Sequence, residues 1–276
     1  LRDIFPQWAV DMGLMKRGLA YRFFKMIERY QYSVADTIGV QSHGNLAYLS
    51  AWAKQRGRRL EVLQNWLSEA PDTGCRISVD KSKLAGRRIF VYAGNMGVAQ
   101  GMDVFLDLAA RMQDRKDVGF LFVGRGSDVA RLAATAESQH LDNVLFHDEI
   151  EPTEIPGLLA QCHVGMVALD PRHKTHNVPG KFLTYMQTGL PVLARINPDN
   201  DLEKLINEER VGRACAGGDA AQLQRLAEQL IVADDDLQAN RRRGKELWSR
   251  LFSSAAAARQ VVMALTEEGS VNSGAA

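Results

Sequence analysis

Short runs of apolar, often β-branched residues alternate with helix-length amphipathic segments from residue 87 onward. The runs are continuous rather than alternating, which is typical of strands buried on both faces of a parallel sheet. Right-handed crossovers between such strands predict a doubly wound α/β fold that binds ligands beyond the carboxyl ends of its strands. Strands are predicted at 87–94, 118–124, 143–147, 163–169, 190–196 and 211–216, and helices at 102–112, 127–138, 151–161, from about 179, and at 202–207, 219–232, 235–249 and 254–267.

Residues 1–66 have the pattern of a second, incomplete α/β unit. Two short strands and two helices offer little surface for an independent core. We therefore expect this segment to be the remnant of a larger N-terminal domain, and the chain, which opens at Leu1, to be N-terminally truncated. Its predicted elements are a helix at 14–30, a strand at 37–42, a helix at 44–56 and a strand at 59–64.

Composition narrows the class of protein. The chain has 276 residues, of which 46% are hydrophobic and 24% charged, which is typical of a globular protein and excludes a disordered one. Thirty-four Lys and Arg against 33 Asp and Glu argue against a nucleic-acid partner held by bulk charge. Three widely spaced cysteines indicate neither a disulfide framework nor a zinc site, so a soluble protein of a reducing compartment is expected. No apolar run approaches the ~20 residues of a membrane span.

A glycine-rich turn, YAGNMGVAQGMD, follows the first of the six strands. Gly94, Gly97 and Gly101 let the backbone pass close to a ligand and can expose N–H groups to an anion. The spacing is neither the dinucleotide G-x-G-x-x-G nor a P-loop. The alternative is a tight turn without a ligand.

The segment HNVPGKFLTYMQTGLPV carries the most chemical information. Pro179 suits the first position of a helix, and Gly180 leaves the N-terminal amides uncovered. Lys181 then opposes the helix dipole, at a cost of about 0.3–1 kcal/mol. That placement makes sense if the helix start and the lysine bind one anion, such as a diphosphate; the alternative is a lysine that extends to solvent. Thr184 and Gln187, one and two turns on, can reach a ribose or sugar hydroxyl.

Three further loops are candidates. Backbone groups around Asp148, Glu149 and Ile150 can hold a base edge, although a polar loop that caps the next helix explains them equally well. Arg125 in GRGS is a candidate phosphate ligand, with a solvated side chain as the alternative. The basic loop DPRHKTHN can close over an anionic donor or simply be solvated.

The predicted helix 14–30 is basic and amphipathic. Its apolar arc includes Leu19, Phe23 and Tyr30, and Arg22 and Arg29 lie opposite. Such a helix can lie on an anionic membrane. Alternatively, the apolar arc packs on the missing domain. Residues 1–66 carry ten Lys and Arg against five Asp and Glu, which indicates that the two units have different partners.

Together, YAGNMGVAQG, LFVGRG and VPGKFLTYMQTGLPVLA resemble the C-terminal domain of retaining glycosyltransferases of family 4, which have the GT-B fold. Bacterial surface-polysaccharide transferases of the fucosamine-transferring type share the G-N-x-G-x-x-Q-G turn and the V-P-x-K helix start. The resemblance covers about residues 36–268 and implies two Rossmann-like halves that face a cleft. The organisation expected from it is an acceptor-domain remnant at 1–66, a linker at 67–86, a nucleotide-sugar-binding domain at 87–252, a crossover helix at 253–268 and a tail at 269–276.

The resemblance also implies site residues. Lys181 is the expected catalytic residue, because it matches the lysine at the family's helix start. Asn95 and Gln100 stand where the family usually has Arg and Lys, and the family's two glutamates fall at His176 and Thr184. The expected donor-binding residues are Gly94, Asn95, Gly97, Gln100, Gly101, Arg125, His147, Asp148, Glu149, Ile150, Val178, Pro179, Gly180 and Thr184.

The implied activity is transfer, with retention, of a hexosyl or N-acetylamino sugar from a nucleotide diphosphate donor, with UDP expected. The implied acceptor is lipid-linked or a saccharide, such as an undecaprenyl-diphosphate-linked sugar, in lipopolysaccharide, O-antigen or capsule synthesis at the inner face of the cytoplasmic membrane. Neither metal nor cofactor is expected. This chain alone is expected to bind donor but to turn over poorly. The alternatives are a sugar-nucleotide epimerase using Asp170, His173 and His176, and a noncatalytic nucleotide-sugar or membrane-binding module.

Overall fold

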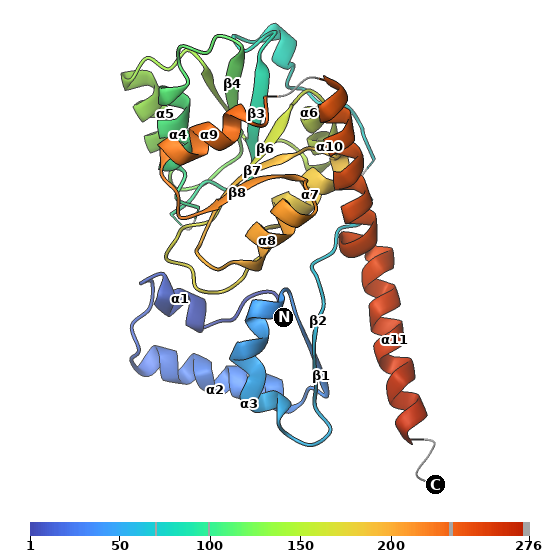
Figure 1. Cartoon of the computed structure of the whole chain (residues 1–276). Helices are drawn as coiled ribbons and strands as arrows, with labels where there is room; N and C mark the ends of the chain where they lie inside the picture. The colour runs from blue at the N-terminus through green and yellow to red at the C-terminus, as the bar shows by residue number, and fades with distance from the viewer. Residues whose placement is uncertain (70, 99, 232–233, 273–276) are drawn as a thin grey trace.

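The computed structural model describes residues 1–69, 71–98, 100–231 and 234–272 and places them around two parallel sheets (Figure 1). In the larger sheet the strand order is β5-β4-β3-β6-β7-β8. In this doubly wound order, β4 and β5 are added on one side of β3, and β6, β7 and β8 are added on its other side. All six predicted strands are confirmed: β3 (Arg88–Ala93), β4 (Val118–Val123), β5 (Val144–His147), β6 (Val164–Ala168), β7 (Val192–Ile196) and β8 (Gly212–Ala216).

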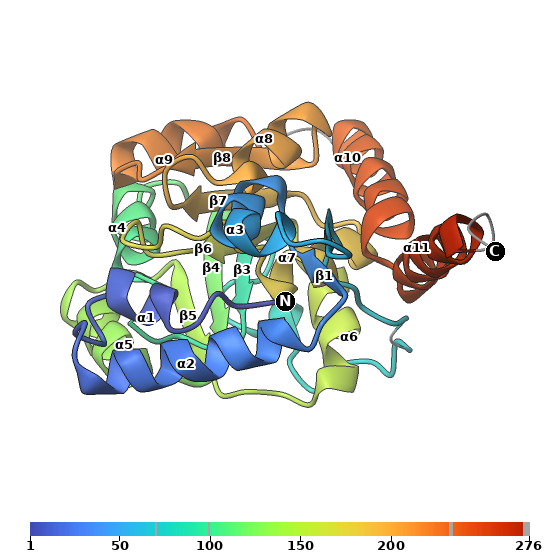
Figure 2. The same ribbon diagram turned by 90° about the horizontal axis from the view of Figure 1, so that it is seen from below.

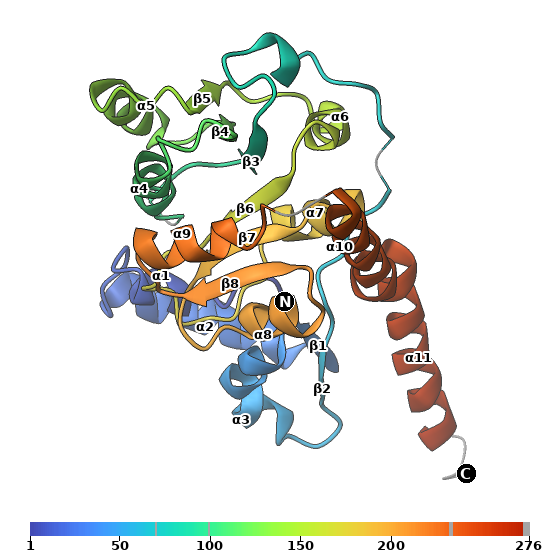
Figure 3. The ribbon, with the colours of Figure 1, turned by 45° about the horizontal axis from the view of Figure 1, so that its top comes forward.

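Helices cover both faces of this sheet, which is why most of its strand positions are apolar and buried (Figures 1 and 3). Along β4, Phe120 and Phe122 enter the core on one face, and Leu121 and Val123 enter the core on the other. The first face is covered by α4 (Asp103–Arg111), α5 (Val129–Ser138) and α9 (Ala220–Glu228), and the second by α6 (Ile155–Ala160), α7 (Gly180–Thr188), α8 (Asp201–Glu208) and α10 (Asp234–Leu247).

Several predicted helix boundaries were wrong. The predicted helix 151–161 is a 3₁₀ turn, η3 (Pro152–Glu154), followed by α6, because Glu151 and Glu154 form a capping box around Pro152. α10 passes into a π-helical turn, η4 (Trp248–Phe252), and then into α11 (Ser254–Asn272). The predicted tail therefore begins inside a helix, and its residues 273–276 lie outside the described residues. Residues 70, 99 and 232, in the predicted linker, glycine turn and helix 219–232, also lie outside them.

The N-terminal unit is built on two parallel strands, β1 (Thr37–Val40) and β2 (Arg59–Val62). Its small core consists of Ile38, Val40, Leu49 and Trp52. The predicted helix 44–56 is a 3₁₀ segment followed by a single turn of α-helix, consistent with the poor helix formers Gly and Asn near its start. The remaining elements are α1 (Gln7–Asp11), which was not predicted, α2 (Leu19–Ser33), η1 (His43–Leu49), α3 (Ser50–Ala53) and, between the units, η2 (Val79–Lys81).

α2 begins at Leu19 rather than at residue 14, because the preceding Gly18 is extended, with φ −109° and ψ −155°. Its apolar arc is open in the described part of the chain: Leu19 is 85% exposed, Phe23 54% and Tyr30 72%. Figure 2 shows α2 lying across the lower face of the molecule.

α11 runs back alongside the N-terminal unit (Figure 1). The Leu67 amide donates to the Phe252 carbonyl over 2.8 Å just before the helix begins. Further along, the Arg59 guanidinium donates to the Ala264 carbonyl over 3.1 Å. The end of the chain thus ties the two units together.

Candidate functional site

A cavity of about 410 Å³ lies at the carboxyl ends of β3 and β4, where the start of α7 closes it. This is the edge at which doubly wound sheets bind ligands. Its lining includes seven of the predicted site residues: Gly94, Asn95, Arg125, Glu149, Ile150, Lys181 and Thr184. The other lining residues are Ala93, Val123, Gly124, Pro152, Ile155 and Tyr185.

Lys181 lies in the first turn of α7. Pro179 is the residue before the helix, with an extended ψ of 138°, so the helix begins at Gly180 and not at the proline. The Lys181 Nζ donates to the Tyr92 hydroxyl over 2.8 Å and lies 4.2 Å from the centroid of that ring. Burial lowers the pKa of Lys181 from 10.5 to about 8. The side chain is therefore folded inward beside the cavity, and the interpretation that it extends to solvent was wrong.

Two buried tyrosines lie at this edge of the sheet, and neither was predicted as a site residue: Tyr92 contacts the lysine, and Tyr185 lines the cavity. The Tyr92 hydroxyl donates to the Asn95 carbonyl over 2.7 Å. The Tyr185 hydroxyl donates to the Val91 carbonyl over 3.2 Å and accepts from the Ala93 amide over 3.3 Å. Burial raises the pKa of both phenols, so they stay neutral. The available signal was a tyrosine two residues before the first glycine of the turn.

The first glycine turn approaches a second turn, at the end of β4. Gly94 has φ +137° and Gly124 has φ +146°, a region that favours glycine. A Cβ on Gly124 would lie 2.0 Å from the Gly94 carbonyl oxygen, and a Cβ on Gly94 would lie 3.7 Å from the Lys181 Nζ. The two glycines therefore allow the turns to meet and bring the backbone next to the lysine.

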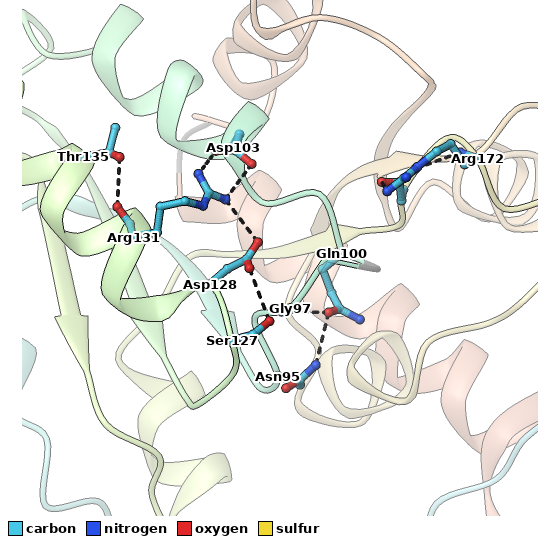
Figure 4. A network of polar contacts seen from close by, with 10 residues as sticks. Asn95, Gly97, Gln100, Asp103, Ser127, Asp128, Arg131, Thr135 and Arg172 are labelled. Atoms are coloured by element: carbon cyan, nitrogen blue, oxygen red, sulfur yellow. Dashed lines mark hydrogen bonds and ion pairs between the residues drawn. The ribbon is translucent and has the colours of Figure 1, made fainter. Parts of the chain in front are cut away.

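Gln100 closes the first turn from within (Figure 4). Its Oε1 accepts from the Gly97 amide over 3.0 Å and from the Asn95 side-chain amide over 3.2 Å. The expectation that the Gly97 N–H is exposed to an anion was therefore wrong for this structure. Gly97, Gln100 and Gly101 lie outside the cavity lining, and their role in donor binding stays a prediction.

The loop after β5 forms the far rim of the cavity. The Arg125 Nε lies 3.2 Å from the Glu149 Oε2, and both side chains are exposed. The His147 carbonyl accepts from the Gly124 amide over 3.1 Å, which ties this loop to the second glycine turn. The His147 and Asp148 side chains are not part of the lining. That this loop holds a base stays a prediction, and Glu149 and Ile150 are the two of its predicted residues that line the cavity.

The residues around the start of α7 divide into those inside and those outside the cavity. Thr184 lines it, and its hydroxyl donates to the Gly180 carbonyl over 3.3 Å. Val178, Pro179 and Gly180 are not lining residues. The Gln187 amide donates to the Ser68 carbonyl over 2.9 Å. Gln187 is thus engaged with the linker, and the expectation that it reaches a sugar hydroxyl is not met here.

The side chains considered for epimerase chemistry lie elsewhere. Asp170 pairs with Arg172 over 2.8 Å, and the His173 ring lies 6.4 Å from the ring of Trp8. The His176 Nδ1 lies 3.4 Å from an oxygen of Asp201. None of the three lines the cavity. Across the described ranges, no group of three or more His, Cys, Asp and Glu side chains can hold a metal ion, and no helix has the length and apolarity needed to cross a membrane.

Residues 87–232, more than half of the chain, match the family described as Glycosyl transferases group 1. The chain therefore belongs to this family. Its sequence is 25% identical over 241 residues to the probable glycosyltransferase WbjE of Pseudomonas aeruginosa, covering 85% of this chain and 59% of WbjE. It is 32% identical over 80 residues to the putative colanic acid biosynthesis glycosyl transferase WcaI of Escherichia coli (strain K12), covering 28% of this chain and 19% of WcaI.

Solved structures share the fold. The sucrose-phosphate synthase of Thermosynechococcus elongatus superposes with a TM-score of 0.71 at 18% identity, covering 96% of this chain and 66% of that one. Anabaena HepE, solved with UDP-glucose, gives 0.64 at 18% identity, covering 83% and 64%. WaaG, a glycosyltransferase involved in lipopolysaccharide biosynthesis, gives 0.62 at 14% identity, covering 94% and 72%. The predicted α/β fold of the GT-B type is confirmed.

Proposed function

We propose that this chain forms the donor-binding part of a retaining glycosyltransferase that uses a UDP-sugar. The observation that carries the proposal is the Lys181 ammonium at the start of α7, packed beside Gly94 in the cavity at the sheet edge. HepE, which shares the fold, was solved with UDP-glucose. The sugar is a hexosyl or N-acetylamino sugar, with N-acetyl-fucosamine suggested by the sequence resemblance.

In the proposed reaction an acceptor hydroxyl oxygen bonds to the anomeric carbon as the bond from that carbon to the UDP oxygen breaks. The hydroxyl proton passes to the departing phosphate, and attack from the same face retains the configuration. Lys181 and the amides at the start of α7 stabilise the negative charge that develops on UDP. Removal of one such preorganised donor typically costs about 3 kcal/mol. In this scheme the charge is balanced by the chain without a metal ion.

Calorimetric titration with UDP, with and without EDTA, tests the donor site. We expect saturable, EDTA-insensitive binding that weakens at least about tenfold in Lys181→Ala, because a charge-assisted contact contributes about 1.5–3 kcal/mol. Lys204→Ala is the matched control, since Lys204 is 76% exposed on α8 and 3.8 Å from Glu208. Absence of UDP binding to the folded parent protein would refute the proposal.

We further propose a lipid-linked acceptor, such as an undecaprenyl-diphosphate sugar, reached at the inner face of the cytoplasmic membrane. The names of WcaI and WaaG connect them with colanic acid and lipopolysaccharide. On α2, the exposed Leu19, Phe23 and Tyr30 stand beside exposed Arg22 and Arg29, a combination suited to an anionic bilayer.

Cosedimentation with vesicles tests this membrane contact. We expect binding to vesicles rich in phosphatidylglycerol, little binding to phosphatidylcholine alone, and loss of binding in Phe23→Glu. Val262→Glu is the control, because Val262 is a similarly exposed apolar residue on α11. Equal binding by Phe23→Glu and the parent protein would exclude α2 as the contact.

A further inference from the structure

The N-terminal unit holds the backbone that leads into α7. The Asn45 side chain makes two hydrogen bonds to one residue: its Oδ1 accepts from the His176 amide over 2.9 Å, and its Nδ2 donates to the His176 carbonyl over 3.2 Å. The Ser42 hydroxyl donates to the same carbonyl over 2.9 Å. The Gln41 Oε1 accepts from the Val178 amide over 3.1 Å. All four hydrogen bonds are made to main-chain atoms of His176 and Val178. They therefore fix the path of the backbone of this segment and do not depend on its side chains.

The depth of this contact shows how tightly the two units fit. Asn45 is 1% exposed and Gln41 is 4% exposed. A Cβ on Gly44 would lie 2.1 Å from the His176 Nδ1, so the imidazole occupies the space of a side chain. The Gly44 amide also donates to an Asp201 oxygen over 2.7 Å. Separating the units would leave these buried polar groups without partners, which is unfavourable, so the docked arrangement resists displacement.

The segment held in this way ends directly at the start of α7. Val178 is followed by Pro179, after which the helix begins, and Lys181 lies in its first turn. No flexible stretch separates the anchored backbone from the lysine. The ammonium end of the lysine is held by its hydrogen bond to the Tyr92 hydroxyl on β3. A shift of the anchored segment therefore moves the start of α7 relative to Tyr92 and Gly94.

We propose that Asn45 and Gln41 are positioning residues for the donor site, which act by holding the start of α7, and that Gly44 sets how closely the N-terminal unit approaches it. The identity of the ligand in this inference, UDP, rests on the proposed function. The position of Lys181 against Tyr92 is independent of that function.

UDP titration of four variants tests the proposal. We expect Asn45→Ala to bind UDP about fivefold more weakly, the equivalent of about 1 kcal/mol for a lost backbone contact. Gly44→Ala keeps every polar side chain of the contact but forces the units apart, and should weaken binding to a similar degree. Tyr48→Phe removes a peripheral bond of 3.3 Å to the Lys174 carbonyl and should change the affinity less than about twofold. Gly18→Ala, where a Cβ meets nothing within 4 Å, is the glycine control.

A second readout separates positioning from mere loss of stability. The rate at which acetic anhydride labels Lys181, followed against pH by mass spectrometry, reports the pKa of the amine. In the parent protein it should titrate near pH 8, and in Asn45→Ala and Gly44→Ala the midpoint should move up towards 10.5 as the amine leaves its buried site. Both controls should match the parent.

The outcomes distinguish the two proposals. If the parent protein does not bind UDP, the proposed function fails, and the labelling profile alone decides the positioning role. If Asn45→Ala and Gly44→Ala are folded by circular dichroism, yet label at Lys181 as the parent does, the positioning role is refuted, whatever their UDP affinity. A Tyr48→Phe effect as large as that of Asn45→Ala would also overturn it, because it would make the whole interface responsible.

Discussion

Replacing Lys181 with methionine removes an ammonium group that the folded protein holds largely away from water. Burial lowers the pKa of this amine from 10.5 to about 8. A change of one pKa unit corresponds to about 1.4 kcal/mol. Keeping the amine charged in the folded protein at neutral pH therefore lowers the free energy of unfolding by about 3 kcal/mol. Methionine is similar in length and adapts to irregular gaps, so it can occupy the same space without that cost.

Part of the gain is offset by lost contacts. The hydrogen bond from Nζ to the Tyr92 hydroxyl and the contact with the ring together contribute about 1–2 kcal/mol. We therefore expect the free energy of unfolding of Lys181→Met to exceed that of the parent by about 1–2 kcal/mol at pH 7. UDP binding should be lost in the same variant, because methionine carries no charge. The parent protein is less stable because it keeps a buried cation at the site that binds the ligand.

The dependence on pH has a defined sign. Below pH 8 the lysine is protonated in both the folded and unfolded states, so the parent carries the full cost. Between pH 8 and 10.5 the unfolded chain holds more protons than the folded one, and the stability of the parent rises with pH. The advantage of Lys181→Met should therefore shrink and reverse within this range, so that above it the parent is the more stable protein by about the 1–2 kcal/mol of the contacts that methionine lacks.

Urea unfolding of both proteins, followed by circular dichroism at pH 7, 8, 9 and 10, measures this difference. The control Lys204→Met should stay within about 0.5 kcal/mol of the parent at each pH, because Lys204 is exposed. The reasoning fails if Lys181→Met is less stable than the parent at pH 7, or if the difference is the same at pH 7 and pH 10.

Three further substitutions test other parts of the structure. Gly124→Ala should lower the free energy of unfolding by about 3 kcal/mol or more, because its Cβ would lie 2.0 Å from the Gly94 carbonyl oxygen; a change below about 1 kcal/mol in urea unfolding would contradict this close approach. Gly180→Ala adds a methyl group that meets nothing within 4 Å and keeps the backbone amide, so it should raise stability by up to about 1 kcal/mol in urea unfolding; a loss of stability would contradict the open space at this position. Arg131→Gln breaks the exposed pair with Asp103 (Figure 4), and should cost less than about 1 kcal/mol in thermal unfolding; a larger loss that persists in 1 M salt would mean that the pair is not screened.

Much of the larger domain follows from local patterns in the sequence. Most positions of its six strands are apolar, and such runs between amphipathic helices identify a sheet buried on both faces. The same local reasoning located Gly94 at a turn and Lys181 at a helix start, and both line the cavity. The pattern is readable here because burial on two faces favours apolar side chains at successive positions of a strand; Arg195 in β7 and Arg213 in β8 are exceptions that are only partly buried.

Local patterns failed where a residue's partner is distant in sequence. Gln187 donates to the linker, and Gln100 accepts from the Gly97 amide of its own loop. From the sequence alone, a glutamine at either position could equally well contact the linker, its own loop or a ligand. The 3₁₀ segment η1 and the extended Gly18 likewise changed the helices predicted for the N-terminal unit, because glycine weakens the helix signal without specifying what replaces it.

The strand runs, the positions of the glycine turns and the lysine that opens a helix can be read from the amino-acid sequence, since each depends on neighbours within a few residues. The hydrogen bond from this lysine to Tyr92 and the hold of Asn45 on the backbone before it arise from the tertiary structure. Those contacts join residues 89 and 131 positions apart. The order of strands in the sheet and the docking of the two units bring such residues together. Their hydrogen bonds stabilise the structure because burial removes the water that would otherwise bind the same polar groups.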